Sequence, residues 1–292
     1  MKTILKPHTI GIFLSLLFLC SCATEHPAQL PADVLMNKGA GRGDELLATL
    51  HLENGEKLLF IVDTGWPGVC LDKSLESELG RCFWTHKVHE CYGIKTMKLF
   101  RAPKLYSGNA RLQLGGWIWT GDLSALSNEM ARDTGTNRPI MGILGMSCLK
   151  HYCVQLDFSA SKLRFLDDAN SDKQDWGKAF PLKQIDGCVA IRENLVGIKG
   201  EDSLIDTGCN FDGFLTPKLF VNWTNQMEQL PKGQARSPNA VLGGDSYSDV
   251  YLAGNGDING IGLHFLARHL VTFDFPNRTM YLKRTSTGPR IP

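Results

Sequence analysis

The amino-acid sequence predicts a mainly β protein that is built from two similar halves. Three observations support this fold class. A stretch of residues 144–158 recurs at 261–275, and an apolar strand ending in Asp-Thr-Gly precedes each copy. In addition, 30 Gly and 13 Pro are spread along the 292 residues, which is typical of a chain with many turns. The length of 292 residues and the 43% hydrophobic content are enough to bury one large core or two of ordinary domain size.

The repeat is the strongest organising feature of the chain. Residues 144–158 align with residues 261–275 without a gap, and five positions are identical. Each copy then passes through a polar turn into a short apolar strand, at 163–166 in the first and 280–282 in the second. This pattern predicts a short helical turn followed by a β-hairpin in each half.

A second shared element lies upstream of each copy. The apolar residues 58–62 lead into Asp-Thr-Gly at 63–65, and residues 203–205 lead into the same tripeptide at 206–208. A third Asp-Thr-Gly at 133–135 follows no apolar strand and precedes turn-forming residues. We interpret this third copy as a surface loop without a catalytic role. The apolar strand before the tripeptide, and not the tripeptide alone, therefore distinguishes the first two copies from the third.

The order of these elements divides the chain into two lobes with a polar connection between them. The predicted boundaries are a signal peptide at 1–22, a tether at 23–45, an N-terminal lobe at 46–168, a linker at 169–177, a C-terminal lobe at 178–285 and a tail at 286–292.

The N-terminus has the features of an export signal. Lys2 and Lys6 precede the apolar residues 10–19, a run that is too short to span a bilayer. Residues 19–23 resemble a bacterial lipobox, in which Cys22 would become the lipidated first residue of the mature protein. The alternative is ordinary cleavage nearby and release. We therefore expect a lipid-anchored protein of the cell envelope, periplasmic or at the outer membrane, or else a secreted one.

Seven of the nine cysteines follow the export signal. Disulfides are plausible outside the cytoplasm. Cys82 with Cys91 and Cys148 with Cys153 are close enough in sequence to be candidate pairs, although pairing does not follow from spacing. Because seven is odd, at least one thiol stays free or pairs between chains.

The apolar strands that end at 63–65 and 206–208, with the glycine elements at 142–145 and 260–262, resemble the pepsin and retropepsin superfamily of aspartic peptidases. The resemblance covers the pattern of most residues from about 46 to 285. It implies a bilobal acid protease fold, in which two homologous β-barrel-like lobes carry short helices. It also implies that Asp63 and Asp206 form a catalytic pair at a pseudo-twofold axis, without a metal or another cofactor.

The chemistry implied by this resemblance needs two carboxyl groups in contact. Like charges about 3 Å apart do not both ionise easily, so the pair shares one proton, as in aspartic peptidases generally. The ionised member draws a proton from an attacking water, and the protonated member donates to the peptide carbonyl oxygen. Which aspartate holds the proton stays unassigned. Four residues are expected to support the pair. Gly65 and Gly208 allow the backbone to turn tightly, and Thr64 and Thr207 form hydrogen bonds across the axis to the opposite loop.

Two positions depart from the family pattern. Trp66 and Cys209 follow the two glycines, where the family usually places Ser, Thr or Ala. A hydroxyl there can bond the outer carboxylate oxygen, and an indole cannot do so in the same manner. The hairpin flap that covers substrate in this family should lie between Asp63 and residue 142. Tyr92 and Tyr106 are its candidates, and its position is left open.

These features predict an aspartic endopeptidase that acts on an extended peptide or protein. The alternative is a catalytically silent envelope protein that keeps the fold to bind a peptide or another partner. The net charge of +1 provides no field that attracts nucleic acid. Residues 86–91 lack the second half of a zinc site, and 255–266 lack the final Glu of a calcium loop, so we predict no metal.

Overall fold

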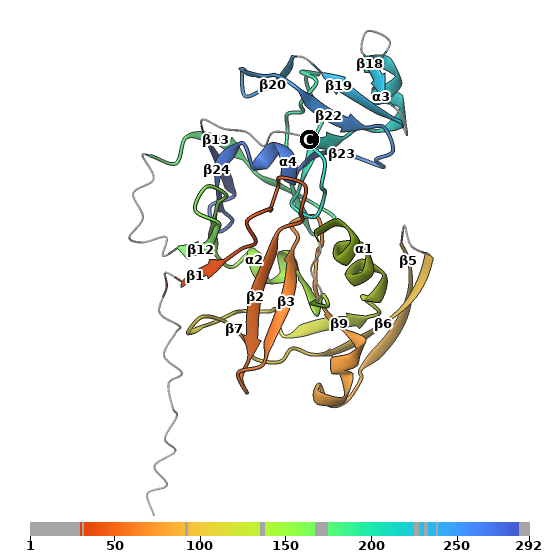
Figure 1. Cartoon of the computed structure of the whole chain (residues 1–292), viewed down its shortest axis with the longest axis vertical. Helices are drawn as coiled ribbons and strands as arrows, with labels where there is room; N and C mark the ends of the chain where they lie inside the picture. The colour runs from red at the N-terminus through yellow and green to blue at the C-terminus, as the bar shows by residue number, and fades with distance from the viewer. Residues whose placement is uncertain are drawn as a thin grey trace, which may run out of the picture.

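The computed structural model describes residues 30, 32–90, 93–134, 138–166, 175–224, 228–230, 233–237 and 239–285. Within these residues, strands form three large sheets and one two-stranded sheet, with short helices between them (Figure 1). The prediction of a mainly β protein is therefore confirmed. In Figure 1, the nine-stranded sheet lies in the lower part of the view and the eight-stranded sheet in the upper part.

The N-terminal half forms the nine-stranded sheet. Its strands, in spatial order, are β5 (Trp84–Glu90), β6 (Gly93–Arg101), β9 (Trp117–Gly121), β4 (Val69–Asp72), β10 (Gly142–Leu144), β3 (Lys57–Val62), β2 (Leu47–Leu52), β7 (Leu105–Ser107) and β8 (Ala110–Arg111).

The C-terminal half forms the eight-stranded sheet. In the corresponding direction its strands are β18 (Glu228–Leu230), β19 (Gln234–Ser237), β22 (Val250–Ala253), β17 (Gly213–Phe214), β23 (Asn259–Gly262), β16 (Ser203–Asp206), β15 (Cys188–Ile191) and β14 (Lys183–Ile185). The separate two-stranded sheet joins β20 (Ala240–Leu242) and β21 (Asp245–Tyr247).

The two sheets repeat the same topology. The sequence β5-β6-β9-β4-β10-β3-β2 matches β18-β19-β22-β17-β23-β16-β15 strand for strand. The directions also match: β3 pairs with β10 in parallel, as β16 does with β23, and β4 pairs with β9 in parallel, as β17 does with β22. The internal repeat that the sequence predicts is therefore a repeat of structure.

A six-stranded sheet joins the halves. Its strands are β1 (Ala32–Leu35), β12 (Lys162–Leu166), β11 (Cys153–Asp157), β24 (His269–Asp274), β25 (Thr279–Arg284) and β13 (Lys178–Pro181). The hairpins β11–β12 and β24–β25 are those predicted from the repeat. They pair antiparallel about Gln155 and Thr272, which are equivalent positions of the repeat, and Gln155 Nε2 donates to Thr272 Oγ1 at 3.0 Å. A local twofold axis therefore passes through this pair.

The helices are short. They are the 3₁₀ helix η1 (Lys73–Glu78) and the α-helices α1 (Ser124–Thr134), α2 (Met146–Leu149), α3 (Pro217–Thr224) and α4 (Leu263–Leu266). The elements α2 and α4 are the helical turns predicted before each hairpin. The prediction that the third Asp-Thr-Gly lies in a surface loop is wrong for its first two residues, because Asp133 and Thr134 are the last residues of α1.

The nine-stranded sheet buries both of its faces around its central strands. Side chains alternate between faces along a strand, so Phe60 and Val62 point into the main core while Ile61 points to the other side. On that other side, Ile61 belongs to a smaller cluster with Met130 of α1. The helix α1 therefore covers this face of the sheet, close to the end of β3.

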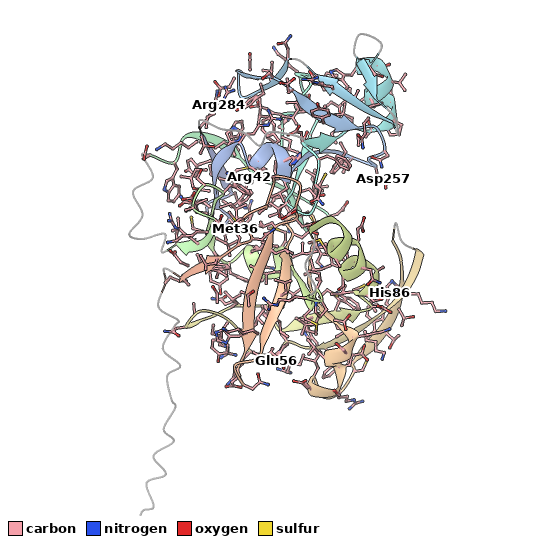
Figure 2. All side chains as sticks on the ribbon, viewed as in Figure 1. Met36, Arg42, Glu56, His86, Asp257 and Arg284 are labelled. Atoms are coloured by element: carbon pink, nitrogen blue, oxygen red, sulfur yellow. The ribbon has the colours of Figure 1, made fainter. Side chains whose placement is uncertain are left out.

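Part of the predicted tether is folded. In residues 32–45, β1 pairs with β12, and Ala32 and Val34 are buried in alternation with exposed neighbours. The following loop reaches α4: a Cβ on Gly41 would lie 2.3 Å from Ala267 Cβ, and Arg42 lies beside α4 in Figure 2. The alternating pattern of β1 covers only four residues, and the Pro, Ala and Gly residues around it are typical of a linker. Residues 1–29, which include Cys22, lie outside the described residues.

One candidate disulfide is wrong. Cys148 is a free thiol in α2, so no bridge to Cys153 is formed. Cys82 is also a free thiol, and its candidate partner Cys91 lies outside the described residues. The described part of the chain has no helix long and apolar enough to cross a membrane.

Candidate active site

The two aspartate loops meet between the halves. Asp63 directly follows β3, and Asp206 is the last residue of β16. Gly65 N–H donates to Asp63 Oδ1 at 2.7 Å, and Gly208 N–H donates to Asp206 Oδ1 at 2.9 Å. A Cβ on Gly65 would lie 2.6 Å from the Asp206 carboxyl, and one on Gly208 would lie 2.6 Å from the Asp63 carboxyl. Each carboxyl group therefore sits against the opposite loop, where only glycine leaves room.

The two threonines bond across the axis in a reciprocal pattern. Thr64 Oγ1 donates to Ile205 O, and Thr207 Oγ1 donates to Val62 O, both at 2.7 Å. In return, Thr64 N–H donates to Thr207 Oγ1 at 3.0 Å, and Thr207 N–H donates to Thr64 Oγ1 at 3.1 Å. Both threonines are buried. Each half thus fixes the loop of the other, and this sets the position of both carboxyl groups.

Burial raises the pKa of both aspartates above the ordinary carboxyl range. For Asp63, the charge of Asp206 raises the pKa further, and the loop N–H donors only partly oppose the shift. The two side chains are hydrogen-bonded to each other. The pair therefore keeps one proton at pH values where an isolated carboxyl group is ionised, and the titration belongs to the pair.

A cavity of about 560 Å³ opens beside the carboxyl pair. Asp63 and Gly208 form part of its wall. Most of the remaining lining is apolar and comes from the sheet face under α1, from α1 itself and from the loop after Asp206, including Ile61, Leu126 and Phe211. This arrangement places an ionisable pair at the wall of a mainly apolar pocket.

The residues after the two glycines hold equivalent backbone positions. Trp66 O accepts from Met146 N–H of α2, and Cys209 O accepts from Leu263 N–H of α4, both at 2.8 Å. Their side chains differ: Trp66 lines the cavity with its Nε1 buried and unbonded in the described structure. Burial raises the pKa of the Cys209 thiol to about 12. Neither side chain supplies a hydroxyl group to the carboxyl pair.

Two further residues near the pair were not predicted. The thiol of Cys188 on β15 donates to Gly65 O at 3.1 Å, and burial raises its pKa to about 12, so it remains a donor. Glu45 lines the cavity and accepts a hydrogen bond from Asn210 Nδ2. Cys188 lies outside both Asp-Thr-Gly segments, and Glu45 lies in the segment predicted to be a tether. No local sequence pattern therefore indicated that either residue belongs to the site.

The flap candidates are not placed at the site. Tyr92 lies outside the described residues. Tyr106 belongs to β7, pairs with His51 of β2 and stacks on its ring, with centroids 5.4 Å apart. In the β2–β3 pair, Leu47 lies opposite Ile61, so His51 is about 13 Å further along β2, at about 3.3 Å per residue, away from the aspartates. The structure therefore does not bring Tyr106 to the carboxyl pair.

Comparison with known proteins identifies the fold but not the family. No family model matches the sequence, and no curated protein matches it either. Among solved structures, the chain is similar to the crystal structure of Basic 7S globulin from soybean, with a TM-score of 0.57 and 10% sequence identity. The match covers 89% of this chain and 96% of the globulin. That protein has a pepsin-like fold, so the likeness supports the same fold here.

The described residues contain no group of three or more His, Cys, Asp or Glu side chains that is placed to hold a metal ion.

Proposed function

We propose that this chain is an aspartic endopeptidase with Asp63 and Asp206 as its catalytic pair. The observation that carries the proposal is the reciprocal arrangement of the two loops. Each glycine N–H bonds its own aspartate, each threonine bonds the opposite loop, and the two carboxyl groups meet at an apolar cavity. In this proposal, the two halves act as the lobes of a bilobal enzyme, and an extended peptide binds between them.

The mechanism follows from one proton shared by two carboxyl groups. The ionised carboxylate accepts a proton from a water molecule as that water attacks the peptide carbonyl carbon. The protonated carboxyl donates its proton to the carbonyl oxygen, which gives a neutral tetrahedral diol. Collapse of the diol transfers a proton to the leaving amine and restores the shared proton. The raised pKa of the pair supports this role, because one carboxyl group remains an acid near neutral pH.

A catalytically silent, peptide- or partner-binding protein is the second candidate. Two observations favour it: Trp66 and Cys209 supply no hydroxyl to the carboxyl pair, and the similar solved structure carries the name of a globulin instead of an enzyme. The paired carboxyl groups argue against it. Two buried acids in contact raise the free energy of the folded state, and a binding protein has no need of either.

Asp63→Asn and Asp206→Asn test the proposal directly. Each should lower the rate of peptide cleavage by about 10²–10⁴-fold or more, because neither variant can both accept and donate the proton. The measurement is cleavage of a fluorogenic peptide library at several pH values. Asp133→Asn is the matched control, since it alters the third Asp-Thr-Gly at the end of α1 and should leave cleavage unchanged.

Full activity in either dyad variant would refute the proposal. A transition-state mimic of the statine type separates the two candidate functions further. Tight binding that needs both aspartates supports the enzyme, whereas a folded wild-type chain that neither cleaves peptides nor binds the mimic supports the silent protein.

We also propose that the chain is exported and anchored through a lipid on Cys22, or released after cleavage nearby. The basic start, the apolar run and the lipobox-like residues 19–23 support this proposal. The mass of the mature N-terminal peptide distinguishes the lipidated form from the released one.

A further inference from the structure

Exposed aromatic side chains lie at the beginning of β5 and β9 and at the cavity. Four Phe and Trp side chains in the described structure are more than a third exposed: Phe83, Trp84, Trp117 and Phe211. Phe211 lines the cavity, and the other three lie at the beginning of β5 and β9. Trp84 is the most exposed of them, at 57%. Clustered exposed aromatic groups mark a surface that binds something.

The strand register connects this surface to the floor of the cavity. Residues paired across neighbouring strands point to the same face of a sheet. One such row crosses six strands, from β3 to β5, through Ile61, Ile143, Cys70, Trp119, Leu99 and Trp84. Its first three members line the cavity beside Asp63. The exposed aromatic surface and the cavity floor are therefore parts of one sheet face.

A series of neighbouring aromatic rings leads from the cavity toward the edge of the sheet. Trp66, which lines the cavity, lies near Trp119: a Cβ on Gly68 would be 3.5 Å from Trp66 Nε1 and 3.4 Å from Trp119 Cδ1. Trp119 in turn lies near Trp84, with ring centroids 6.2 Å apart. His86 of β5 follows, 5.4 Å from Trp84, at the right-hand edge of the molecule in Figure 2. The aromatic surface thus runs from the aspartate loop to the sheet edge.

We propose that Trp84 and Trp119, the aromatic platform, form a remote subsite for the polypeptide whose scissile bond lies at the aspartates. The platform binds a large apolar or aromatic side chain of that polypeptide. This inference rests on the proposed function. The sheet face between the cavity and the platform indicates the occupant. A peptide that leaves the cavity along the row from Ile61 to Trp84 meets only apolar members of that row before it reaches the platform.

The strand spacing sets the distance to the platform. Strands lie about 4.8 Å apart, so β9 is about 14 Å and β5 about 24 Å from β3. An extended peptide covers about 3.3 Å per residue. Trp119 and Trp84 are therefore placed to contact a residue about four to seven positions from the scissile bond. The structure does not fix on which side of that bond the residue lies.

The experiment uses matched peptides with one cleavable core. Each carries either Phe or Ser at one position, four to seven residues from the cut, on either side. For the wild-type chain, Phe should raise kcat/KM about tenfold over Ser at one or more positions. In Trp84→Ala this Phe/Ser ratio should fall toward one, and in Trp84→Phe most of it should remain. The control is Leu35→Ala, which removes a 74% exposed side chain on β1 and should keep the wild-type ratio.

The ratio distinguishes the platform from general damage, because a poorly folded variant loses activity on both peptides alike. A wild-type ratio near one at every position overturns the proposal, as does a ratio that survives Trp84→Ala. If the wild-type chain cleaves no peptide, the proposed function fails, and fluorescence anisotropy of dye-labelled Phe and Ser peptides then decides the inference. A Phe preference in binding that is lost in Trp84→Ala supports the platform, and equal binding of both peptides overturns it.

Discussion

The two halves of the molecule share a strand order but differ in what lies between two equivalent strands. Between β9 and β10, the N-terminal half inserts the eleven-residue helix α1, which covers the sheet and contributes Leu126 to the cavity. Between β22 and β23, the C-terminal half has only the short segment 254–258. The elements that position the aspartates are therefore repeated, whereas those that shape the cavity belong mainly to one half.

The aspartate loops show the same contrast at atomic scale. In the C-terminal half, Asp212 is buried and accepts from Arg268 Nη2, which lies 3.1 Å from each of its carboxylate oxygens, and from Tyr251 N–H at 2.8 Å. In the N-terminal half, the loop is packed by Trp66 and receives the Cys188 thiol from the other half. The bonds at the axis are symmetric, whereas different side chains support the two loops around it. The symmetry of the axis can therefore be tested separately from its surroundings.

The largest effect is expected from a methyl group at either glycine of the axis. Gly65→Ala and Gly208→Ala each place a Cβ 2.6 Å from the opposite carboxyl group, so the loops must separate. Each variant should lower the free energy of unfolding by about 3 kcal/mol or more and abolish cleavage. Chemical denaturation measures the first effect, and peptide cleavage the second.

Gly68→Ala is the matched control for these variants. It lies in the same loop as Gly65, but its Cβ would meet its nearest neighbour at an ordinary 3.4 Å. It should cost little stability. If Gly208→Ala were tolerated as well as Gly68→Ala, the reciprocal packing of the two loops would be disproved.

A smaller and equal effect is expected from the two threonines. Thr64→Val and Thr207→Val keep the side-chain shape but remove a hydroxyl that donates once and accepts once. Each leaves a buried carbonyl and a buried N–H without a partner, and each should cost about 1–3 kcal/mol of unfolding free energy. The two losses should agree within about 0.5 kcal/mol. Urea denaturation of the pair is the measurement, and a loss confined to one variant would show that one half alone holds the axis.

The sequence was sufficient for the parts of the site that are encoded locally. The strand before Asp63, the strand before Asp206 and the repeat at 144–158 each have a pattern that can be read within about fifteen residues. Contacts that depend on distant pairing had no such pattern. Cys188 reaches the loop of Asp63 only because β15 pairs with β16 in the other half, and β1 is stable only as an added edge strand.

The aromatic platform shows the same limit of sequence reasoning. Trp84 and Trp119 are 35 positions apart, and each alone reads as an ordinary packed aromatic. Only the register, in which Leu99 pairs with both, places them in one row. The free thiol of Cys148 follows from structure in a similar way, since short spacing to Cys153 does not bring side chains on α2 and β11 together.

The last effect concerns the shared proton and appears as a pH dependence of stability. Because the pKa of Asp63 is raised in the folded state, the folded chain binds more protons than the unfolded chain above about pH 4. The wild-type chain therefore loses stability as the pH rises from about 4 through the raised pKa of the pair. Asp63→Asn removes the group that binds the extra proton, so its Tm relative to wild type should increase between pH 4 and pH 8. In a chain of this size, a rise in Tm of about 2–4 °C corresponds to about 1 kcal/mol of unfolding free energy.

Taking the difference between variant and wild type cancels the other titrating groups, such as His269, whose pKa is lowered to about 4 by burial in both proteins. Asp206→Asn should give the same trend, because the proton belongs to the pair, whereas Asp133→Asn should follow wild type at every pH. Calorimetric scans at four pH values are sufficient. A difference in Tm that stays constant with pH would mean that the two carboxyl groups share no proton. The two loops would then be symmetric in their hydrogen bonds but not in the titration of their carboxyl groups.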